Sequence, residues 1–526
     1  MQPRRVIGKI KDIGRSTRSN STADVCPVAA ESEKNFNAIR PFKDIPGPKG
    51  LPLVGNLFRF IPGIGRYGSV RSKTILQMLR QDFGDIVRLE DIWTRSPTVY
   101  LFNVEDCEKM YRVEGPFPSR LTMETLKVHR EMNASMFNGY LGLASSQGEA
   151  WHKFRSNVNP YMMQPHAIMP HVAQVDQVSG EFVEKMRKLR DAETLKLPPS
   201  FNNEMHKWAL ESICAIALDH RMGCLSDDLS PDSDPQRMIN AVHVMFDSFF
   251  VLEVKPSLWK YYKTRKLRRL FAALDSITSI SVKYVDAAKE RFNARNEEEK
   301  RDRARHKSIL ENSLNIDEGT GYILALDMLA GGIDTTSNTA GSMLYYIASN
   351  PPVQEKLREE VLRALPDKNS PVTYEILKSK IPYLKACVKE SLRLSPIAFA
   401  NLRTMTKDVV IGGYEIPAGI NVLAIHGLLS QESAHFPNPE AFLPERWLRD
   451  SKGVASAKDT HPFVYMPFGF GARTCIGRRF AQLEIETLAL KVFRNFKVEW
   501  KEPPLKIKTR FINTIDSPLE FTLIDL

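Results

Sequence analysis

The stretch Phe468-Gly-Phe-Gly-Ala-Arg-Thr-Cys475-Ile-Gly477 decides how the rest of this chain is interpreted. After its cysteine, apolar residues recur at a helical spacing, at Ile476, Phe480, Leu483 and Leu488. The pattern predicts a loop that delivers Cys475 to the start of a helix. Unpaired N–H groups and the positive end of the helix dipole favour a thiolate at such a position. Gly471 and Gly477 have no Cβ, so the backbone can pass close to a large flat ligand.

Arg473 lies two residues before the cysteine and can pair with a carboxylate on such a ligand. These features suit a haem whose iron takes Cys475 as its axial thiolate and whose propionate meets Arg473. The stretch resembles the haem-binding signature of cytochromes P450, which it matches at Phe468, Gly471, Arg473, Cys475 and Gly477. Such a match arises by chance roughly once in ten thousand chains of this length. The alternative is a buried structural cysteine in a glycine-rich turn.

The composition describes a basic globular protein. The 526 residues are 43% hydrophobic and carry a formal charge of +11, with a pI of about 9.2. No DNA- or RNA-binding motif accompanies this charge, so acidic protein surfaces and anionic lipid are the expected partners, and nucleic acid is not. The cysteines form no CxxC pair, which predicts reduced thiols inside a cell. They are Cys26, Cys107, Cys214, Cys224, Cys387 and Cys475.

Residues 1–30 have the composition of a mitochondrial transit peptide, which is rich in arginine and serine and poor in acids. The first 22 residues contain one acid, Asp12, and the basic residues Arg4, Arg5, Lys9, Lys11, Arg15 and Arg18. This segment lacks the apolar run of about 20 residues that a membrane span needs. We expect cleavage somewhere before about residue 45, and the alternative is a disordered basic tail.

The folded domain is expected to cover residues 45–526. It opens with a Pro- and Gly-rich segment at 45–56 that resembles the proline-rich start of eukaryotic P450s. Residues 86–89 and 98–102 are short β-rich runs, whereas helical periodicity dominates later segments. The resemblance implies a mainly α protein with a small β region, in which the haem lies between a long central helix and the cysteine loop.

Residues 320–349 can form one helix, roughly 45 Å long, that the Asn-Pro-Pro step at 350–352 ends. Most of its faces are apolar, so we expect it to cross the core. Its segment Ala330-Gly-Gly-Ile-Asp-Thr-Thr336 resembles the oxygen-activation segment of P450s. By that resemblance, Thr335 hydrogen-bonds the dioxygen co-substrate, Asp334 relays protons from water, and the two glycines leave room for dioxygen. The alternative is a threonine that hydrogen-bonds back to its own bent helix.

Glu390-Ser-Leu-Arg393 matches the ExxR motif of the family, although Glu355 and Arg358 have the same spacing. The former pair lies in an apolar helix upstream of Pro444-Glu-Arg446-Trp447. That segment resembles the PERF segment of P450s, with tryptophan in the place of phenylalanine. The resemblance implies that Arg446 closes a buried ion network with the motif under the haem. Such a network fixes geometry, so its role is structural rather than catalytic.

Four further residues match positions where P450s place partners of the haem propionates. Trp151 and Arg155 are four apart and so share one helix face. Their alternative is a surface cation–π pair. Arg403 lies in an extended run, and His461 precedes the cysteine loop, where a purely structural histidine is the alternative.

Lys385 and Lys389 are four apart on the helix of the ExxR motif. The segment around them resembles mitochondrial P450s, in which two such lysines dock an acidic [2Fe–2S] ferredoxin. Arg478 and Arg479, just after the cysteine, would widen this basic patch. A solvated helix face is the alternative. Separately, the segment 255–263 mixes aromatics with lysines, as membrane-interface segments do, unless its aromatics pack inward.

The resemblance covers roughly residues 45–526 and is greatest to the insect mitochondrial P450 family twelve. It implies a monooxygenase with haem b that inserts one atom of O2 into a hydrophobic xenobiotic or steroid-like molecule. Electrons would pass from NADPH through a ferredoxin reductase and a ferredoxin. The implied location is the matrix side of the inner mitochondrial membrane, peripheral and without a transmembrane helix. The alternatives are a microsomal-type P450 that uses a flavoprotein reductase and a haem-thiolate binding protein without oxygenase activity.

Overall fold

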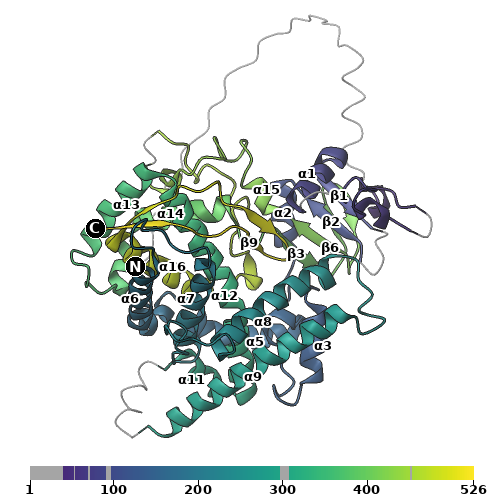
Figure 1. Cartoon of the computed structure of the whole chain (residues 1–526). Helices are drawn as coiled ribbons and strands as arrows, with labels where there is room; N and C mark the ends of the chain where they lie inside the picture. The colour runs from purple at the N-terminus through teal and green to yellow at the C-terminus, as the bar shows by residue number, and fades with distance from the viewer. Residues whose placement is uncertain (1–38, 52–53, 69–71, 91–95, 296–306, 451–452) are drawn as a thin grey trace, which may run out of the picture.

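The computed structural model describes residues 39–51, 54–68, 72–90, 96–295, 307–450 and 453–526. Helices dominate the described chain, as predicted (Figure 1). Those before the central helix are α1 Ser72–Phe83, α2 Val104–Arg112, α3 Glu124–Met132, α4 Gly142–Ser145, α5 Gly148–Met162, α6 Val172–Leu189, α7 Phe201–Ala217, α8 Asp234–Phe249, α9 Arg265–Asn293 and α11 Ile309–Leu314. From the central helix onward they are α12 Glu318–Ala348, α13 Pro351–Ala364, α14 Pro382–Leu394, α15 His426–Leu429 and α16 Arg478–Asn495.

The β structure is small, which confirms the predicted fold class. A four-stranded sheet has the order β1-β2-β6-β3, with β2 and β6 parallel and the other neighbours antiparallel. Three separate two-stranded sheets, β4-β5, β7-β10 and β8-β9, make up the rest of the β structure. The strands are β1 Ile86–Leu89, β2 Thr98–Leu101, β3 Asn401–Thr404, β4 Val409–Ile411, β5 Tyr414–Ile416, β6 Asn421–Ala424, β7 Phe496–Glu499, β8 Ile507–Thr509, β9 Asn513–Ile515 and β10 Thr522–Asp525.

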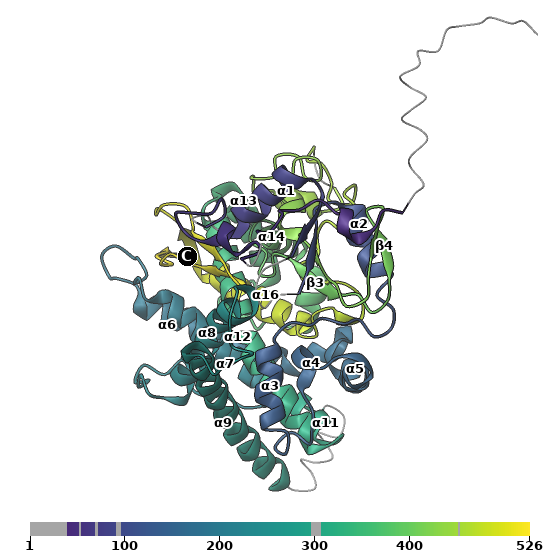
Figure 2. The same ribbon diagram turned by 90° about the vertical axis from the view of Figure 1, so that its right-hand side faces the viewer.

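The long helix α12 runs through the middle of the helical part, in contact with α7, α14 and α16 (Figure 1). It begins two residues before the predicted start, where the Asp317 side chain accepts a hydrogen bond from Thr320 N. Apolar residues on most of its faces are buried, so its position follows from composition rather than from one amphipathic stripe. Seen from the side, α3, α4 and α5 lie together on the opposite side from the β-rich part with β4 (Figure 2).

The apolar patterns of residues 205–219 and 238–254 predict two further helices, and both differ from the structure at their ends. The one predicted at 205–219 is α7, which begins four residues earlier. The one predicted at 238–254 ends as an α-helix at Phe249 and continues as a short π-helical turn, Phe250–Val254. The apolar pattern does not reveal this change, because a single π-helical turn is too short to alter the apolar spacing visibly.

Within the described residues, no helix is both long and apolar enough to span a bilayer. The predicted transit peptide, residues 1–30, lies outside the described residues. The five described cysteines are free: Cys107, Cys214, Cys224, Cys387 and Cys475.

Candidate active site

The cysteine loop leads into α16 as the sequence pattern predicts. The Cys475 N–H donates to Phe468 O at 2.8 Å, which closes the loop. Burial raises the pKa of the Cys475 thiol, and N–H groups of Gly477 and Arg478 partly offset this. Cys475 has exposed surface although protein encloses it, so it faces an internal space rather than bulk solvent. A thiolate at this position therefore needs a compensating cation, which an iron ion would supply.

Gly471 is a position at which the loop requires glycine. Its φ of +69° lies in the left-handed region that side chains disfavour. A Cβ there would also collide with Glu114 Oε1. Gly477 has an ordinary φ, and a Cβ on it would lie 3.9 Å from Cys475 Sγ, on the side of the thiol.

Four arginines surround the cysteine loop, and we call Arg120, Arg155, Arg403 and Arg473 the arginine cluster; Arg120 is half-buried and the other three are buried. Burial lowers the pKa of Arg120 and of Arg155 to about 10, and that of Arg473 to about 9. Mutual repulsion adds to the effect at Arg473 and Arg120. A cluster with lowered pKa values is short of negative charge, because an adequate anion would have raised them.

The anions within the cluster do not balance its charge. Glu114 forms an ion pair with Arg403. No other carboxylate among the described residues forms an ion pair with a member of the cluster. Arg120 Nε and Arg155 Nε are buried without a hydrogen-bond partner in the described structure. Unpaired guanidinium N–H groups are strong donors to carboxylates. The residues therefore fit a haem, whose propionate carboxylates supply the missing negative charge beside a cysteine thiolate.

The guanidinium N–H groups of Arg473 donate hydrogen bonds to other groups of the protein in this structure. It donates to Pro118 O at 2.9 Å, to Ser146 O at 3.0 Å and to Gln147 Oε1 at 2.7 Å. Its guanidinium also stacks 3.9 Å from the centre of the buried Trp151 ring. The cation–π contact of Trp151 is thus with Arg473 in the cysteine loop, and not with Arg155 on its own helix.

Arg155 reaches the cysteine loop directly, because its Nη2 donates to Thr474 O at 2.9 Å. Arg403 Nη2 donates to Phe470 O at 3.2 Å, in the same loop. His461 differs from both, since its Nε2 lies 3.2 Å from Glu108 Oε2 and its side chain is about one-third exposed, at 32%. Within the described structure, no hydrogen bond or ion pair joins His461 to the arginine cluster, so its role toward a propionate stays a prediction.

Sequence reasoning missed Arg120 and Glu114. Neither belongs to a recognisable motif, and both lie more than 280 residues from Arg403, with which Glu114 forms an ion pair. Gln147 links this segment to the cysteine loop, because it exchanges hydrogen bonds with the Arg120 backbone and accepts one from Arg473.

The glycines of α12 have different environments. A Cβ on Gly331 would meet no atom within 4 Å, and Gly331 is exposed although most residues of its helix are buried. A Cβ on Gly332 would lie 2.8 Å from Ile213 Cγ1 on α7. Gly331 thus leaves open space, as predicted for both glycines, whereas Gly332 lets α7 approach α12 closely. The helix stays continuous through both.

Thr335 faces the open side of α12 with Gly331. Its hydroxyl donates to Gly331 O at 2.6 Å, the back-bonding that was the alternative interpretation. The neighbouring Thr336 side chain bonds to Glu484 on α16, nine residues after Cys475. That contact places this part of α12 across from the first turns of the helix that follows the cysteine.

Asp334 points to the other side of α12, toward two histidines. Its carboxylate is 3% exposed and lies 3.1 Å from His243 Nε2 and 3.6 Å from His206 Nδ1. Burial lowers the pKa of His206 to about 4. Burial also opposes the charged form of His243, but the Asp334 carboxylate outweighs it and raises the pKa of His243. Asp334 is thus connected to the partly exposed His243, which gives a route toward solvent.

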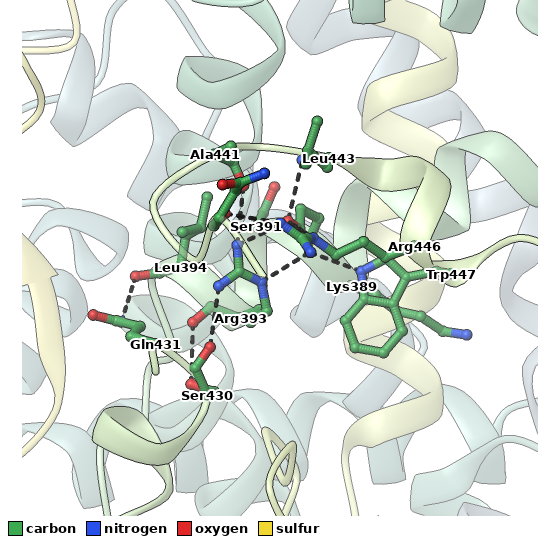
Figure 3. Close-up of polar contacts among 12 residues, drawn as sticks. Lys389, Ser391, Arg393, Leu394, Ser430, Gln431, Ala441, Leu443, Arg446 and Trp447 are labelled. Atoms are coloured by element: carbon green, nitrogen blue, oxygen red, sulfur yellow. Dashed lines mark hydrogen bonds and ion pairs between the residues drawn. The ribbon is translucent and has the colours of Figure 1, made fainter. Parts of the chain in front are cut away.

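The residues of the ExxR and PERF segments meet in one buried arrangement (Figure 3), which we call the Glu390 network. Arg393 donates to both oxygens of Glu390, at 2.8 and 3.0 Å. Arg446 Nε donates to Glu390 Oε1 at 3.3 Å. Further Arg393 donors reach Ser430 O and Ala441 O, both at 3.0 Å. The network joins α14 to the segment before the cysteine loop.

Trp447 explains the departure from the PERF pattern. Its indole N–H donates to Glu390 Oε2 at 2.9 Å, so the tryptophan in the place of phenylalanine becomes a fourth member of the network. Phenylalanine has no such donor. Glu390, Arg393 and Arg446 are each at most 1% exposed.

The four basic residues predicted to dock a ferredoxin divide into two kinds. Lys389 and Arg478 are exposed and close enough for their charges to interact, because Arg478 adds to the effect of burial in lowering the pKa of Lys389. The Lys385 ammonium donates hydrogen bonds to Leu377 O and Lys378 O. Arg479 is half-buried and donates to Met163 O. The surface therefore presents Lys389 and Arg478 more fully than the other two.

Known proteins match this chain over nearly its whole length. A family model described as cytochrome P450 matches residues 45–522. Cytochrome P450 CYP12A2 of Musca domestica is 39% identical over 95% of this chain and 93% of its own length. In Drosophila melanogaster, probable cytochrome P450 12a5, mitochondrial, is 38% identical over 93% of this chain and 91% of its own. Probable cytochrome P450 12c1, mitochondrial, of the same organism is 36% identical over 96% and 95%.

Proposed function

The chain belongs to the cytochrome P450 family, whose members are monooxygenases, and we propose that it is a mitochondrial enzyme that oxidises a hydrophobic small molecule with electrons from a ferredoxin. The predicted resemblance to the insect mitochondrial P450s is confirmed by these relatives. In the overall reaction one atom of O2 enters a C–H bond, and the other leaves as water with two electrons and two protons. The relatives support a mitochondrial location, and we place the enzyme on the matrix side.

The single observation that carries the proposal is Cys475 at the start of α16 among the arginine cluster. Cys475 would ligate the iron as thiolate, and the cluster would hold the propionates of haem b, with Trp151 behind Arg473 and Phe468 in the loop. When bound, the haem supplies the dioxygen chemistry. The protein positions the ligand, excludes bulk water and delivers protons.

A carbon monoxide spectrum tests this observation. We expect the reduced, carbonyl-bound protein to show the red-shifted Soret band of thiolate ligation, and C475A to lose it. Cys387 is the matched control, because it is a buried cysteine without a proposed ligand role, and C387A should keep the band. An identical spectrum for C475A and the unaltered chain would refute the assignment.

Proton delivery is assigned to Asp334 and Thr335. Asp334 connects to His243 and so toward solvent, while Thr335 lies on the open side of the same helix turn. We expect T335A to consume NADPH and release peroxide with little product, because the proton no longer arrives in step with the electrons. T339A is the control, since Thr339 makes the same back-bond to its helix but is buried. Normal coupling in T335A would remove Thr335 from this role.

The electron donor is tested by reconstitution with each candidate. Lys389 and Arg478 support an acidic ferredoxin, and electrostatic docking should weaken as salt is added. We expect turnover with a [2Fe–2S] ferredoxin and its NADPH reductase, and slower reduction in K389E. Turnover only with a flavoprotein reductase would favour the microsomal-type alternative. No turnover with either would favour a haem-thiolate binding protein.

A peripheral membrane contact is proposed for the segment 255–263, together with the preceding Val254. Val254, Leu258, Tyr261 and Tyr262 are exposed, by 51%, 40%, 77% and 58%, next to lysines. Trp259 turns inward and donates to Leu252 O, so only part of the predicted aromatic set faces outward. Flotation with anionic vesicles tests this, and Y261S/Y262S should bind less.

A spectral screen with xenobiotic and steroid-like compounds would identify the substrate class.

A further inference from the structure

Three metal-binding side chains from three helices meet beside α12, on a different face from that of Thr335. They are His206 of α7, His243 of α8 and Asp334 of α12, whose nitrogen and oxygen atoms lie within 4.8 Å of one another. The two imidazole rings are in edge-to-face contact, with centroids 4.6 Å apart. Gly332 contributes to the arrangement, because the close approach of α7 to α12 depends on it.

The distances suit a small tetrahedral cation. Ligand atoms about 2.0–2.1 Å from zinc in a tetrahedron are separated by roughly 3.4 Å. The observed separations from Asp334 Oδ1 are 3.1 Å to His243 and 3.6 Å to His206. Imidazole nitrogen and carboxylate oxygen are both donors that zinc accepts. No large movement of the three helices is therefore needed to bring the donors around one ion.

The carboxylate supplies an independent sign of a missing partner. Asp334 Oδ1 is buried and makes no hydrogen bond of acceptable geometry within the described residues, despite its nearby histidines. A buried carboxylate oxygen without a well-formed hydrogen bond is costly, and a cation would offset that cost. Ser337 Oγ forms a 2.7 Å hydrogen bond with His206 Nδ1, which an ion bound to this nitrogen would displace, and the freed hydroxyl is then close enough to serve as a fourth ligand. The His243 side chain is 41% exposed, which opens the cluster to solvent.

We propose that His206, His243 and Asp334 bind one divalent transition-metal ion of the zinc class. This part of the inference is independent of the proposed function. Its consequence rests on that function: an ion on the Asp334 carboxylate occupies the oxygen that would receive and pass a proton. The bound ion is thus a reversible inhibitor of proton delivery that leaves the haem and its cysteine ligand untouched.

Zinc binding is tested on the haem-loaded enzyme after removal of metal with a chelator. Equilibrium dialysis against Zn2+ should give one equivalent per haem, with an affinity at least tenfold weaker in H206Q and H243Q. H166Q is the control, because His166 is exposed and lies outside the cluster. An unchanged carbonyl spectrum verifies that each variant is folded. Equal affinity in H206Q, H243Q and the unaltered chain, or no single-equivalent site, would overturn the proposal.

Turnover with and without Zn2+ tests the consequence. Zinc should raise the ratio of peroxide to product in the unaltered chain and in H166Q, at concentrations that fill the site, and should leave this ratio unchanged in H243Q. If the enzyme has no oxygenase activity, dialysis still decides whether the site exists. If zinc binds to the cluster and coupling is unaffected, the assigned effect on Asp334 is wrong.

Discussion

The Glu390 network and the arginine cluster are both built from buried arginines, but they are completed in opposite ways. In the Glu390 network, one carboxylate receives Arg393, Arg446 and Trp447, and within the described structure no buried polar side-chain atom of these residues lacks a partner. In the arginine cluster, four guanidiniums share Glu114, and two Nε atoms have no partner. The difference separates a group that the protein completes from one that a ligand completes.

Removal of Glu390 should have the largest effect on stability. E390A would leave two buried guanidiniums without their carboxylate, which costs about 3–5 kcal/mol in the free energy of unfolding. Denaturant titration of the haem-loaded enzyme measures this loss. E355A is the matched control, because Glu355 has the same spacing to an arginine but is exposed, and it should change stability by less than about 0.5 kcal/mol. Similar losses in the two variants would contradict a special role for the network.

Acid should weaken the side of the molecule that holds the arginine cluster. His426 is buried against Tyr111, whose ring lies under Arg403, and burial lowers its pKa to about 4. Between its ordinary pKa of about 6.5 and about 4, the unfolded chain binds a proton there that the folded chain does not. The free energy of unfolding therefore falls as pH falls through this window, by up to about 3 kcal/mol.

Urea titrations at several pH values check this slope in H426Q. The slope should be shallower than in the unaltered chain but not zero, because burial gives His206 the same pKa. W447F should keep the full slope, since it alters the other region. An unchanged slope in H426Q would mean that His426 takes up its proton while the protein is still folded.

Substitution of Trp447 tests the network more gently. W447F keeps an aromatic ring against Tyr465, 4.6 Å away, and removes one N–H donor to a charged acceptor. Such a hydrogen bond contributes about 1.5–3 kcal/mol. The loss should appear as a lower denaturant midpoint at unchanged haem content. If W447F is as stable as the unaltered chain, the tryptophan merely fills the position of phenylalanine.

Substitution in the arginine cluster should lower the affinity for haem rather than the free energy of unfolding. It should have the smallest effect of the four. R120M removes a guanidinium whose buried Nε has no hydrogen-bond partner in the described structure, so the haem-free protein should be at least as stable as before. Haem affinity should fall about tenfold, or about 1.4 kcal/mol, because one partner for a propionate is gone. Haem transfer to an acceptor protein measures it. R237M, at an exposed arginine paired with Asp234, should alter neither quantity. A destabilised haem-free R120M would show that the cluster is structural.

Local motifs predicted the cysteine loop, the central helix and the Glu390 network, because each depends on residues a few positions apart or on a recognisable segment. The ion pair of Glu114 with Arg403 could not be predicted, since nothing in the sequence links positions 289 apart. The different tasks of Gly331 and Gly332 also depend on where α7 lies. Spacing alone could not show that the Lys385 ammonium bonds to backbone carbonyls while Lys389 remains exposed.

The histidine neighbours of Asp334 illustrate the same limit. His206, His243 and Asp334 are separated by 37 and 91 residues, and the two histidines lie in α7 and α8, whose sequences contain no functional motif. The sequence of a helix does not show which neighbouring helix a lone polar side chain faces. The roles of Thr335 and Asp334 were therefore predicted from their own segment of α12, whereas the two histidine neighbours of Asp334 were not.

The indole of Trp447 gives this protein a built-in optical probe. Its N–H lies 2.9 Å from a carboxylate oxygen, so its emission should respond to the presence of that charge. The chain contains six tryptophans, but subtracting the spectrum of haem-free W447F from that of the unaltered chain isolates one of them. Refolding followed by this difference signal would time the assembly of a single buried carboxylate with its arginines.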